Sequence, residues 1–323
     1  MKALKNILVT GGAGFIGSHL MELLLKEQYN VTCVDNFDNF YARSIKQGNI
    51  ASCIELPNFK MRELDVRDNS LRNIFSEGEF DLVVHLAVKP GVRPSITHPE
   101  DYFSVNVNGT VHVLELMREF GIKNFIFASS SSVYGNSSKF PYSETDTVDF
   151  PISPYAATKR SGELLTYTYH HLYNINVLNL RFFTVYGPRQ RPDLAVHKFF
   201  ECLYKNRAID IYGDGNSARD YTYVTDTVQG IIAAINYLKK KDSVYEIVNL
   251  GNSHPVSLKE LITSMEEITH KKFEVNYLPM QPGDVNYTCA DIEKAQNLLN
   301  YNPRVSLSEG LQFFKTWYEA NKC

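Results

Sequence analysis

Short apolar runs alternate with stretches of helical periodicity through the first half of the chain. Runs of Val, Ile, Leu and Phe with few polar interruptions predict strands that are buried on both faces, as in a parallel sheet. Between these runs, apolar residues recur every three or four positions, which predicts amphipathic helices. The predicted strands are 6–10, 31–34, 81–86, 124–128 and 177–180, and the predicted helices are 15–26, 100–120 and 154–173. The alternation is typical of an α/β fold.

Three glycines separate the first predicted strand from the first predicted helix. Gly11 permits a tight turn out of the strand, Gly14 lets the backbone approach a pyrophosphate, and Gly17 lets the helix pack closely. The helix N-terminus then offers N–H groups and a partial positive charge to phosphates. Asp35 ends the next strand, 18 residues past Gly17, where a carboxylate binds ribose hydroxyls and repels a 2′-phosphate. The constellation predicts NAD binding, although Asp35 could also be a helix-capping or turn residue.

The second half of the chain is less regular. Loops rich in Gly, Pro and Arg are followed by further helices, and one more buried strand is expected near 244–250. The predicted loops are 187–193 and 213–215, and the predicted helices are 195–205, 257–269 and 306–321. We interpret this pattern as a Rossmann-like doubly wound parallel sheet with a smaller, partly interleaved C-terminal substrate lobe. Residues 1–180 would form the NAD-binding domain, rejoined by the strand near 244–250, and residues 181–323 mainly the lobe.

The composition is ordinary for a globular protein. The 323 residues include 33 Lys and Arg against 36 Asp and Glu, a balance that does not suggest a nucleic acid or membrane partner. No apolar run approaches the ~18 residues of a membrane span, and the N-terminus lacks a signal-peptide pattern. Five scattered cysteines, none in a Cys-x-x-Cys spacing, argue against a disulfide framework or a metal site. We therefore expect no metal, and the cytoplasm as the default compartment.

Tyr155 and Lys159 form the strongest catalytic candidate. Ser153 is a good N-cap and Pro154 a good first helical residue, so the pair begins a helix and lies on one face of it. The ammonium and the helix N-terminus would both favour the phenolate, so we expect a lowered pKa for Tyr155. A second Tyr-x-x-x-Lys at 237–241 is interpreted as the solvated end of an ordinary helix.

Four consecutive serines, 129–132, end the strand that begins at residue 124. Ligands of open parallel sheets bind at this carboxyl edge, although a polar strand end is the simpler alternative. A serine hydroxyl beside a Tyr phenolate and a cationic Lys makes an acid/base relay for an alcohol substrate. His85, in a buried run, is interpreted as a structural histidine.

With these motifs, the chain resembles the extended short-chain dehydrogenases/reductases, and within them the NAD-dependent sugar-nucleotide epimerases. The resemblance extends from Ile7 to about Leu311. Several segments are most similar to UDP-glucuronate 4-epimerases. These segments are His85-Leu86-Ala87, Asn106-Val107-Asn108-Gly109-Thr110, Arg181 to Asp193, Gly213 to Asp220, Asn249-Leu250-Gly251-Asn252 and Pro282-Gly283-Asp284-Val285.

The resemblance implies a role for each matching residue. Tyr155 would take the proton from the sugar 4-OH, Lys159 would hold the nicotinamide ribose, and Ser130 would bind the same sugar hydroxyl. Hydride would leave C4 to give a transient 4-keto sugar and return to the opposite face, so NAD would be tightly bound and regenerated each turnover. The implied cofactor-binding residues are Gly11, Gly14, Phe15, Ile16, Gly17, Asp35, Asn36, Asp65, Val66, Leu86, Ala87, Asn106, Tyr155 and Lys159.

Two serines argue for epimerisation over elimination. Sugar-nucleotide 4,6-dehydratases carry Asp-Glu directly after the catalytic Ser/Thr, and UDP-glucuronate decarboxylases carry Glu at the second place. Ser131 and Ser132 stand at these positions here, so the acid for a second step is missing.

The substrate implied by the resemblance is UDP-glucuronate, which would be converted to UDP-galacturonate. Its carboxylate would meet Ser131, Ser132, Thr184 and Arg191, and Arg219 would bind the UDP phosphates. The other implied substrate residues are Arg93, Asp284 and Thr288. The small Thr288 leaves room for an N-acetyl group, so UDP-GlcNAc/UDP-GalNAc or UDP-glucose/UDP-galactose epimerisation stays an alternative.

Two residues depart from the family pattern, and one other class of function and a homodimer also have to be considered. Gln281 stands where some UDP-galactose epimerases place a phosphate-binding Arg, and Lys89 follows an unusual Ala-Val pair. A non-catalytic NAD-binding sensor or scaffold is a remote alternative. Such a protein would be expected to lack the catalytic Ser, Tyr or Lys, and Ser130, Tyr155 and Lys159 are all present. The family also implies a homodimer, formed through the helices predicted at 100–120 and from 154.

Overall fold

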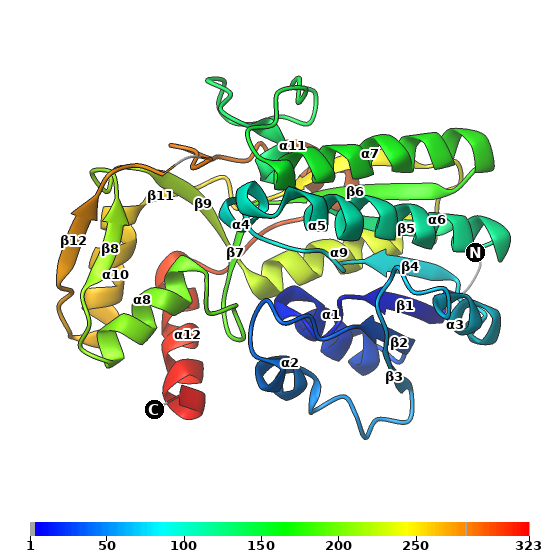
Figure 1. Ribbon diagram of the computed structural model, residues 1–323, viewed down its shortest axis with the longest axis horizontal. Coiled ribbons are helices and arrows are strands. Elements are labelled where there is room, and N and C mark those ends of the chain that lie inside the picture. The colour runs from blue at the N-terminus through cyan, green and yellow to red at the C-terminus, as the bar shows by residue number, and fades with distance from the viewer. Residues whose placement is uncertain (1–3, 282, 323) are drawn as a thin grey trace.

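Seven strands, parallel throughout, form the main sheet of the computed structural model, which describes residues 4–281 and 283–322 (Figure 1). Their order is β10-β6-β5-β4-β1-β2-β3. The strands are β1 (Asn6–Thr10), β2 (Asn30–Asp35), β3 (Phe59–Glu63), β4 (Leu82–His85), β5 (Asn124–Ser130), β6 (Asn176–Phe182) and β10 (Tyr245–Leu250). The strand order reverses between β1 and β4, where doubly wound sheets bind their ligands. The predicted Rossmann-like sheet is confirmed.

Helices cover both faces of this sheet (Figure 1). Side chains alternate along each strand, so Ile7 and Val9 of β1 pack into one apolar cluster and Leu8 into the other. The first cluster includes residues of α1 (Phe15–Lys26), α2 (Arg43–Ile50) and α9 (Val224–Leu238). The second includes residues of α3 (Leu71–Gly78), α6 (Gly109–Glu119) and α7 (Pro154–Tyr173). Continuous apolar strands are therefore explained by burial on both faces.

The helix predicted at 100–120 is not continuous. α5 (Pro99–Phe103) leads into a π-helical turn at Ser104–Asn108, and α6 follows. The periodicity of apolar residues hardly differs between these forms, so the sequence did not reveal the turn. α4 (Val92–Thr97) precedes α5, close to the N-terminal half of α7. Inside the turn, Asn106 is buried and directs its side chain at the loop that follows β4.

The C-terminal lobe contains two small sheets. The three-stranded sheet is ordered β11-β9-β7, and the two-stranded sheet pairs β12 with β8. The strands are β7 (Thr184–Tyr186), β8 (Ile209–Tyr212), β9 (Ala218–Tyr223), β11 (Pro255–Ser257) and β12 (Val275–Leu278). The remaining helices are α8 (Ala195–Tyr204), α10 (Leu258–Thr269), α11 (Glu293–Leu299) and α12 (Leu307–Lys322).

Two segments from the second half of the chain return to the main sheet. β10 pairs with β6 at its edge, and α9 packs beside α1 on one face. The two halves of the chain are thereby interleaved, and the carboxyl ends of the central strands face the lobe (Figure 1). Within residues 4–281 and 283–322, no helix combines the length and apolar character that crossing a membrane requires.

Candidate active site

The glycine loop has the geometry that its sequence predicts. Gly11 has φ of +72°, and a Cβ there would lie 2.6 Å from the backbone nitrogen of Ala87. A Cβ on Gly17 would overlap the carbonyl oxygen of Gly11. α1 begins after Gly14 with neither a side-chain cap nor an acidic residue in its first turn, so its N–H groups are available to an anion.

Asp35 joins the end of β2 to the glycine loop. Its two carboxylate oxygens accept the backbone N–H groups of Ala13 at 3.1 Å and Phe37 at 2.8 Å. The contact with Phe37 is the turn role that the sequence left open, and the contact with Ala13 ties Asp35 to the glycine loop. Burial raises the pKa of Asp35, and the positive charge of Lys46 opposes this effect.

A second polar cluster, formed by Asn36, Asp65 and Arg67, lies at the same end of the site. Asn36 donates to Asp65 at 2.8 Å, and Arg67 holds that carboxylate at 2.8 Å. The hydrogen bonds from Arg67 lower the pKa of Asp65 to about 2, so it is an anion at neutral pH.

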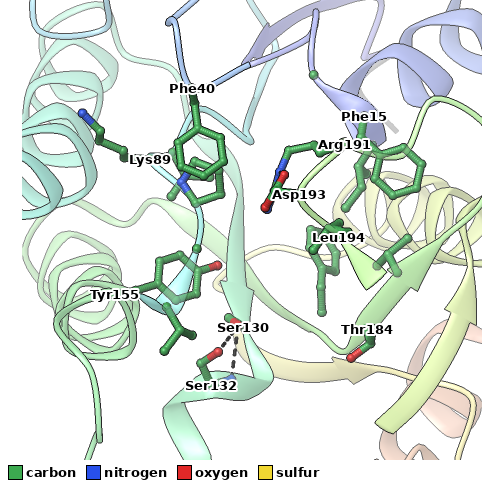
Figure 2. A pocket seen from close by; sticks show the side chains of 18 of the residues that line it. Phe15, Phe40, Lys89, Ser130, Ser132, Tyr155, Thr184, Arg191, Asp193 and Leu194 are labelled. Carbon is green, nitrogen blue, oxygen red and sulfur yellow. Dashed lines mark hydrogen bonds and ion pairs between the residues drawn. The ribbon is translucent and has the colours of Figure 1, made fainter. Parts of the chain in front are cut away.

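One cavity of about 830 Å³ connects this region with the predicted catalytic residues. It is lined by every predicted cofactor, catalytic and substrate residue except Asn106. Figure 2 shows the side chain of Tyr155 facing Ser130 on one side of the cavity, with Arg191 and Asp193 opposite. The topology of the sheet thus brings together residues from nearly the whole length of the chain.

Asn106 is the one predicted site residue that does not line this cavity. Its side-chain oxygen accepts the N–H of Lys89 at 2.7 Å, and its amide donates to the Lys89 carbonyl and to Thr158. Asn106 therefore shapes the loop after β4, which lines the cavity, instead of lining it. His85 is structural as predicted, because Thr10 and Thr110 engage its two ring nitrogens at 2.7 and 3.2 Å.

The N-terminal turn of α7 positions the catalytic candidates. The Ser153 hydroxyl accepts the N–H of Ala156 at 3.1 Å, and Pro154 occupies the first turn, as predicted. The Lys159 ammonium donates to the carbonyl of Ala128 at 2.6 Å. The second Tyr-x-x-x-Lys begins near the end of α9, and its lysine is exposed, in agreement with its interpretation as a solvated helix end.

The ionisation of Tyr155 differs from the prediction. Burial raises its pKa, and the Ser130 hydroxyl and the charge of Arg191 oppose that rise only in part. Lys159 is buried as well, and burial lowers its pKa to about 7. The spacing correctly placed Tyr155 and Lys159 on one face of α7. The prediction of a lowered pKa for Tyr155 was wrong, because it did not consider the loss of solvation on burial.

Ser130 points at its neighbour Ser132. Its hydroxyl donates to the Ser132 hydroxyl at 3.1 Å and accepts the Ser132 N–H at 3.1 Å (Figure 2). These contacts stabilise the turn after β5 and hold three serine side chains, Ser130 to Ser132, at the cavity wall.

Two of the three cationic residues of the predicted substrate set already have acidic partners. Arg191 donates to both oxygens of Asp193 at 2.9 and 2.8 Å, and its guanidinium lies 5.5 Å from the ring centre of Phe40. Arg93 pairs with Asp284 at 2.7 Å. Arg219 differs, since within the described part of the chain no carboxylate lies within 4.0 Å of it.

Thr184 and Thr288 complete the predicted set. Thr184 begins β7 and lines the same cavity as the Ser130–Ser132 turn (Figure 2). The Thr288 hydroxyl accepts the N–H of Asp220 at 3.1 Å, so it is engaged by the backbone of β9. The motif residue Pro282 lies outside the described residues, whereas its neighbour Asp284 lines the cavity. Lys89 pairs with Asp101 at 3.1 Å.

Sequence reasoning missed several cavity residues. They are Phe40, Tyr41, Lys46, Asp193, Lys198 and Tyr212. Their signal was weak, because two aromatic residues in a polar loop after Asp35 do not by themselves indicate a site. No group of three or more His, Cys, Asp or Glu side chains with metal-binding geometry occurs in residues 4–281 and 283–322.

Comparison with known proteins identifies the family. The sequence profile described as GDP-mannose 4,6-dehydratase matches residues 8–313. The chain belongs to this family of extended short-chain dehydrogenases/reductases. Within it, the chain is 42% identical to the UDP-glucuronate 4-epimerase of Thermodesulfobacterium geofontis, over 97% of this chain and 96% of that protein. It is 38% identical to UDP-glucuronate 4-epimerase 3 of Arabidopsis thaliana, over 97% of this chain and 76% of that protein.

Solved structures of this family agree with the fold. The UDP-glucuronic acid 4-epimerase of Bacillus cereus, in complex with UDP-glucuronic acid and NAD, superposes with a TM-score of 0.92 at 39% identity, covering 97% and 99% of the chains. The UDP-glucose 4-epimerase of Thermotoga maritima, solved with UDP-glucose, gives 0.89 at 34% identity, covering 98% and 99%.

Proposed function

We propose that this protein catalyses the NAD-dependent 4-epimerisation of UDP-glucuronate to UDP-galacturonate. The observation that carries the proposal is the single cavity, which joins the glycine loop and Asp35 to Tyr155, Lys159 and the serine turn. The relatives named as UDP-glucuronate 4-epimerases support the same activity. The family profile describes dehydratases, but Ser131 and Ser132 replace the acidic pair that elimination requires.

The residues present fit NAD. The glycine turns leave no room for a Cβ beside the sheet, so the backbone itself forms the wall at which a pyrophosphate would rest. Asp35 faces the cavity with a carboxylate whose remaining lone pairs suit ribose hydroxyls. When bound, NAD would supply a hydride acceptor that becomes a hydride donor in the return step.

Proton transfer falls to Tyr155. Its phenolate, placed at the cavity wall near Ser130, would take the proton of the sugar 4-OH and later return a proton to the oxygen of the 4-keto sugar, as hydride returns to the opposite face of C4. Because burial raises the pKa of Tyr155, the phenolate needs cationic support. Lys159, one turn along the same helix face, is the residue placed to supply it.

The two ends of the sugar nucleotide would meet different cations. Arg191, which lines the same cavity as Thr184 and the serine turn, suits the sugar carboxylate, since a guanidinium binds carboxylates in a bidentate manner. Arg219 has no acidic partner among the described residues, which suits a diphosphate, with Arg93 nearby. Arg191 and Arg93 would then leave their present contacts with Asp193 and Asp284 to bind the ligand.

Assembly and location are part of the same proposal. α7 exposes Leu164, Tyr167 and Leu172, which are between 54% and 57% accessible, and α5 exposes Phe103. An exposed apolar helix pair of this kind supports a homodimer formed through α5–α6 and α7. The free thiols of Cys33, Cys53 and Cys202 are buried and support a reducing compartment, the cytoplasm.

The test is to incubate purified protein with UDP-glucuronate, without added NAD, and to follow the anomeric proton signals by NMR. UDP-galacturonate that approaches a fixed ratio would demonstrate epimerisation, acceptance of the carboxylate and a retained cofactor. Product that forms only after NAD is added would show that the cofactor is lost on purification. If neither condition gives product and UDP-GlcNAc or UDP-glucose reacts, the proposed substrate is wrong.

A further inference from the structure

A buried carboxylate lies next to the catalytic residues and takes no part in the chemistry proposed above. Glu163 is fully buried on α7, one helical turn after Lys159, so their Cβ atoms lie about 6 Å apart on one helix face. The Arg181 guanidinium donates to both of its oxygens at 2.8 and 2.9 Å. Ser129 and Arg160 donate to the same carboxylate at 2.6 and 3.2 Å.

This cluster joins three elements at the edge of the site. Ser129 and Arg181 are register partners at the ends of β5 and β6, and Glu163 binds both from α7. Ser129 lies between Ala128, whose carbonyl accepts the Lys159 ammonium, and Ser130. The contacts of Glu163 therefore fix the end of β5. This strand end carries the Ala128 carbonyl that binds Lys159 and the hydroxyl of Ser130.

The charge of Glu163 also acts on Lys159. Burial lowers the pKa of Lys159 to about 7, and the negative charge of Glu163 opposes this effect. The charged and titratable groups around the two residues are Tyr155 and Arg160 on α7, His85 on β4, Arg181 on β6, Tyr134 after β5, Asp149 in the following loop and Tyr245 on β10. Among these described neighbours, Glu163 is the carboxylate that lies one helical turn from Lys159 and acts on its charge.

Stability alone does not account for this arrangement. Removing an ion pair from water is costly, and apolar residues of similar volume often give equal or greater stability. We propose that Glu163 is a positioning residue, whose carboxylate keeps the Lys159 ammonium charged and fixes the strand end that carries Ser130. The consequence for turnover rests on the proposed function, but the charge state of Lys159 is a property of the protein itself.

The first test is independent of activity. Protein labelled with ¹³C at the lysine ε-carbons is titrated by NMR, and the Lys159 signal is assigned by its loss in Lys159→Met. In Glu163→Gln we expect the Lys159 pKa to fall by about one unit or more, because a favourable charge is removed. Arg181→Gln is the matched control, since it breaks the same ion pair but keeps the carboxylate, and Lys159 should titrate at or above its wild-type value. Equal falls in both variants, or no fall in Glu163→Gln, would overturn the proposal.

The second test measures turnover. The alkaline limb of the kcat profile should move to lower pH in Glu163→Gln, because Lys159 then loses its proton earlier. Glu163→Asp, which keeps the charge, should return the limb to within about half a pH unit of wild type. If Glu163→Gln does not fold, Glu163→Asp and Ser129→Ala decide the matter. Ser129→Ala should lower kcat with little change in KM, and a Lys159 pKa in Glu163→Asp that falls by a full unit would contradict the charge role.

A failure of the proposed function would be recognised separately. If the wild-type protein does not convert UDP-glucuronate, the substrate assignment fails, while the lysine titration still decides the role of Glu163. If the wild-type protein is active and its Lys159 titration is insensitive to Glu163→Gln, the function stands and the positioning role fails.

Discussion

The two ends of the cavity are constructed differently. At the proposed NAD end, Gly11 and Gly17 act through backbone geometry, and Asp35 accepts hydrogen bonds from Ala13 and Phe37, which are near it in sequence. At the sugar-nucleotide end, Arg93 and Asp284 meet across 191 positions of the chain. The glycine turn and Asp35 belong to one short segment of sequence, whereas the contact between Arg93 and Asp284 exists only once the lobe has folded against the sheet.

The difference extends to how each end is prepared for its ligand. At the N-terminus of α1 neither a side-chain cap nor an acidic residue competes for the N–H groups that a phosphate would use. Arg191 and Arg93 are instead paired with carboxylates, so an anionic ligand must compete with Asp193 and Asp284. We therefore expect variants at the NAD end to affect occupancy, and variants at the other end to affect selectivity.

The largest effect is expected between these ends, at Tyr155. Tyr155→Phe removes the proton acceptor and should lower kcat by about 10³-fold or more, since general acid–base groups contribute 10²–10⁴. The fold and bound NAD should be unchanged, as measured by circular dichroism and by the NAD released on denaturation. Activity close to wild type in a folded variant would exclude Tyr155 as the base.

Gly17→Ala tests the NAD end. A Cβ there overlaps the Gly11 carbonyl oxygen, so relief requires movement of the turn that forms the phosphate site. Strain of about 3 kcal/mol would weaken NAD binding about 100-fold, as measured by the NAD content of the purified protein and by titration. Gly48→Ala is the control, because a Cβ at Gly48 meets no atom within 4 Å. Equal NAD loss in both variants would contradict a specific role for the turn.

Arg191→Ala tests selectivity at the sugar end. Loss of a charge-assisted hydrogen bond costs about 2 kcal/mol, so kcat/KM for UDP-glucuronate should fall roughly 30-fold relative to UDP-glucose. Competition between the two substrates in one NMR sample measures this ratio directly. Losses of equal size for both substrates would remove Arg191 from carboxylate recognition.

The sequence predicted features that depend on local patterns better than features that depend on the folded structure. Most of the predicted strands and helices are present, because burial on both faces gives continuous apolar strands and one-sided burial gives periodic helices. The π-helical turn around Asn106 was not predicted, since its apolar spacing resembles that of an α-helix. Asn106 itself was assigned to the cofactor site on family resemblance, and its side chain holds the loop after β4, which lines the cavity.

Electrostatics was the least predictable property. The Tyr155–Lys159 spacing correctly placed both groups on one face of α7, but spacing does not show how much water reaches them. Burial acts against the charged form of each group, which is why the pKa of Tyr155 is raised and that of Lys159 is lowered. The ion pairs of Arg93 and Arg191 were likewise outside sequence reasoning, because both had been assigned to the ligand.

Asp284→Asn tests the contact between the two sides of the cavity and should have the smallest effect. The Arg93 side chain is 44% exposed, and such pairs contribute at most about 1 kcal/mol, so KM for the UDP-sugar should fall by less than about fivefold as Arg93 is released. The effect should diminish at high salt, because screening already weakens the competing pair. Glu119→Gln removes the partner of Arg72 on the surface and should leave KM unchanged. A large rise in KM for Asp284→Asn would instead mean that the carboxylate contacts the ligand directly, and the two ends of the cavity would then both be prepared for their ligands before binding.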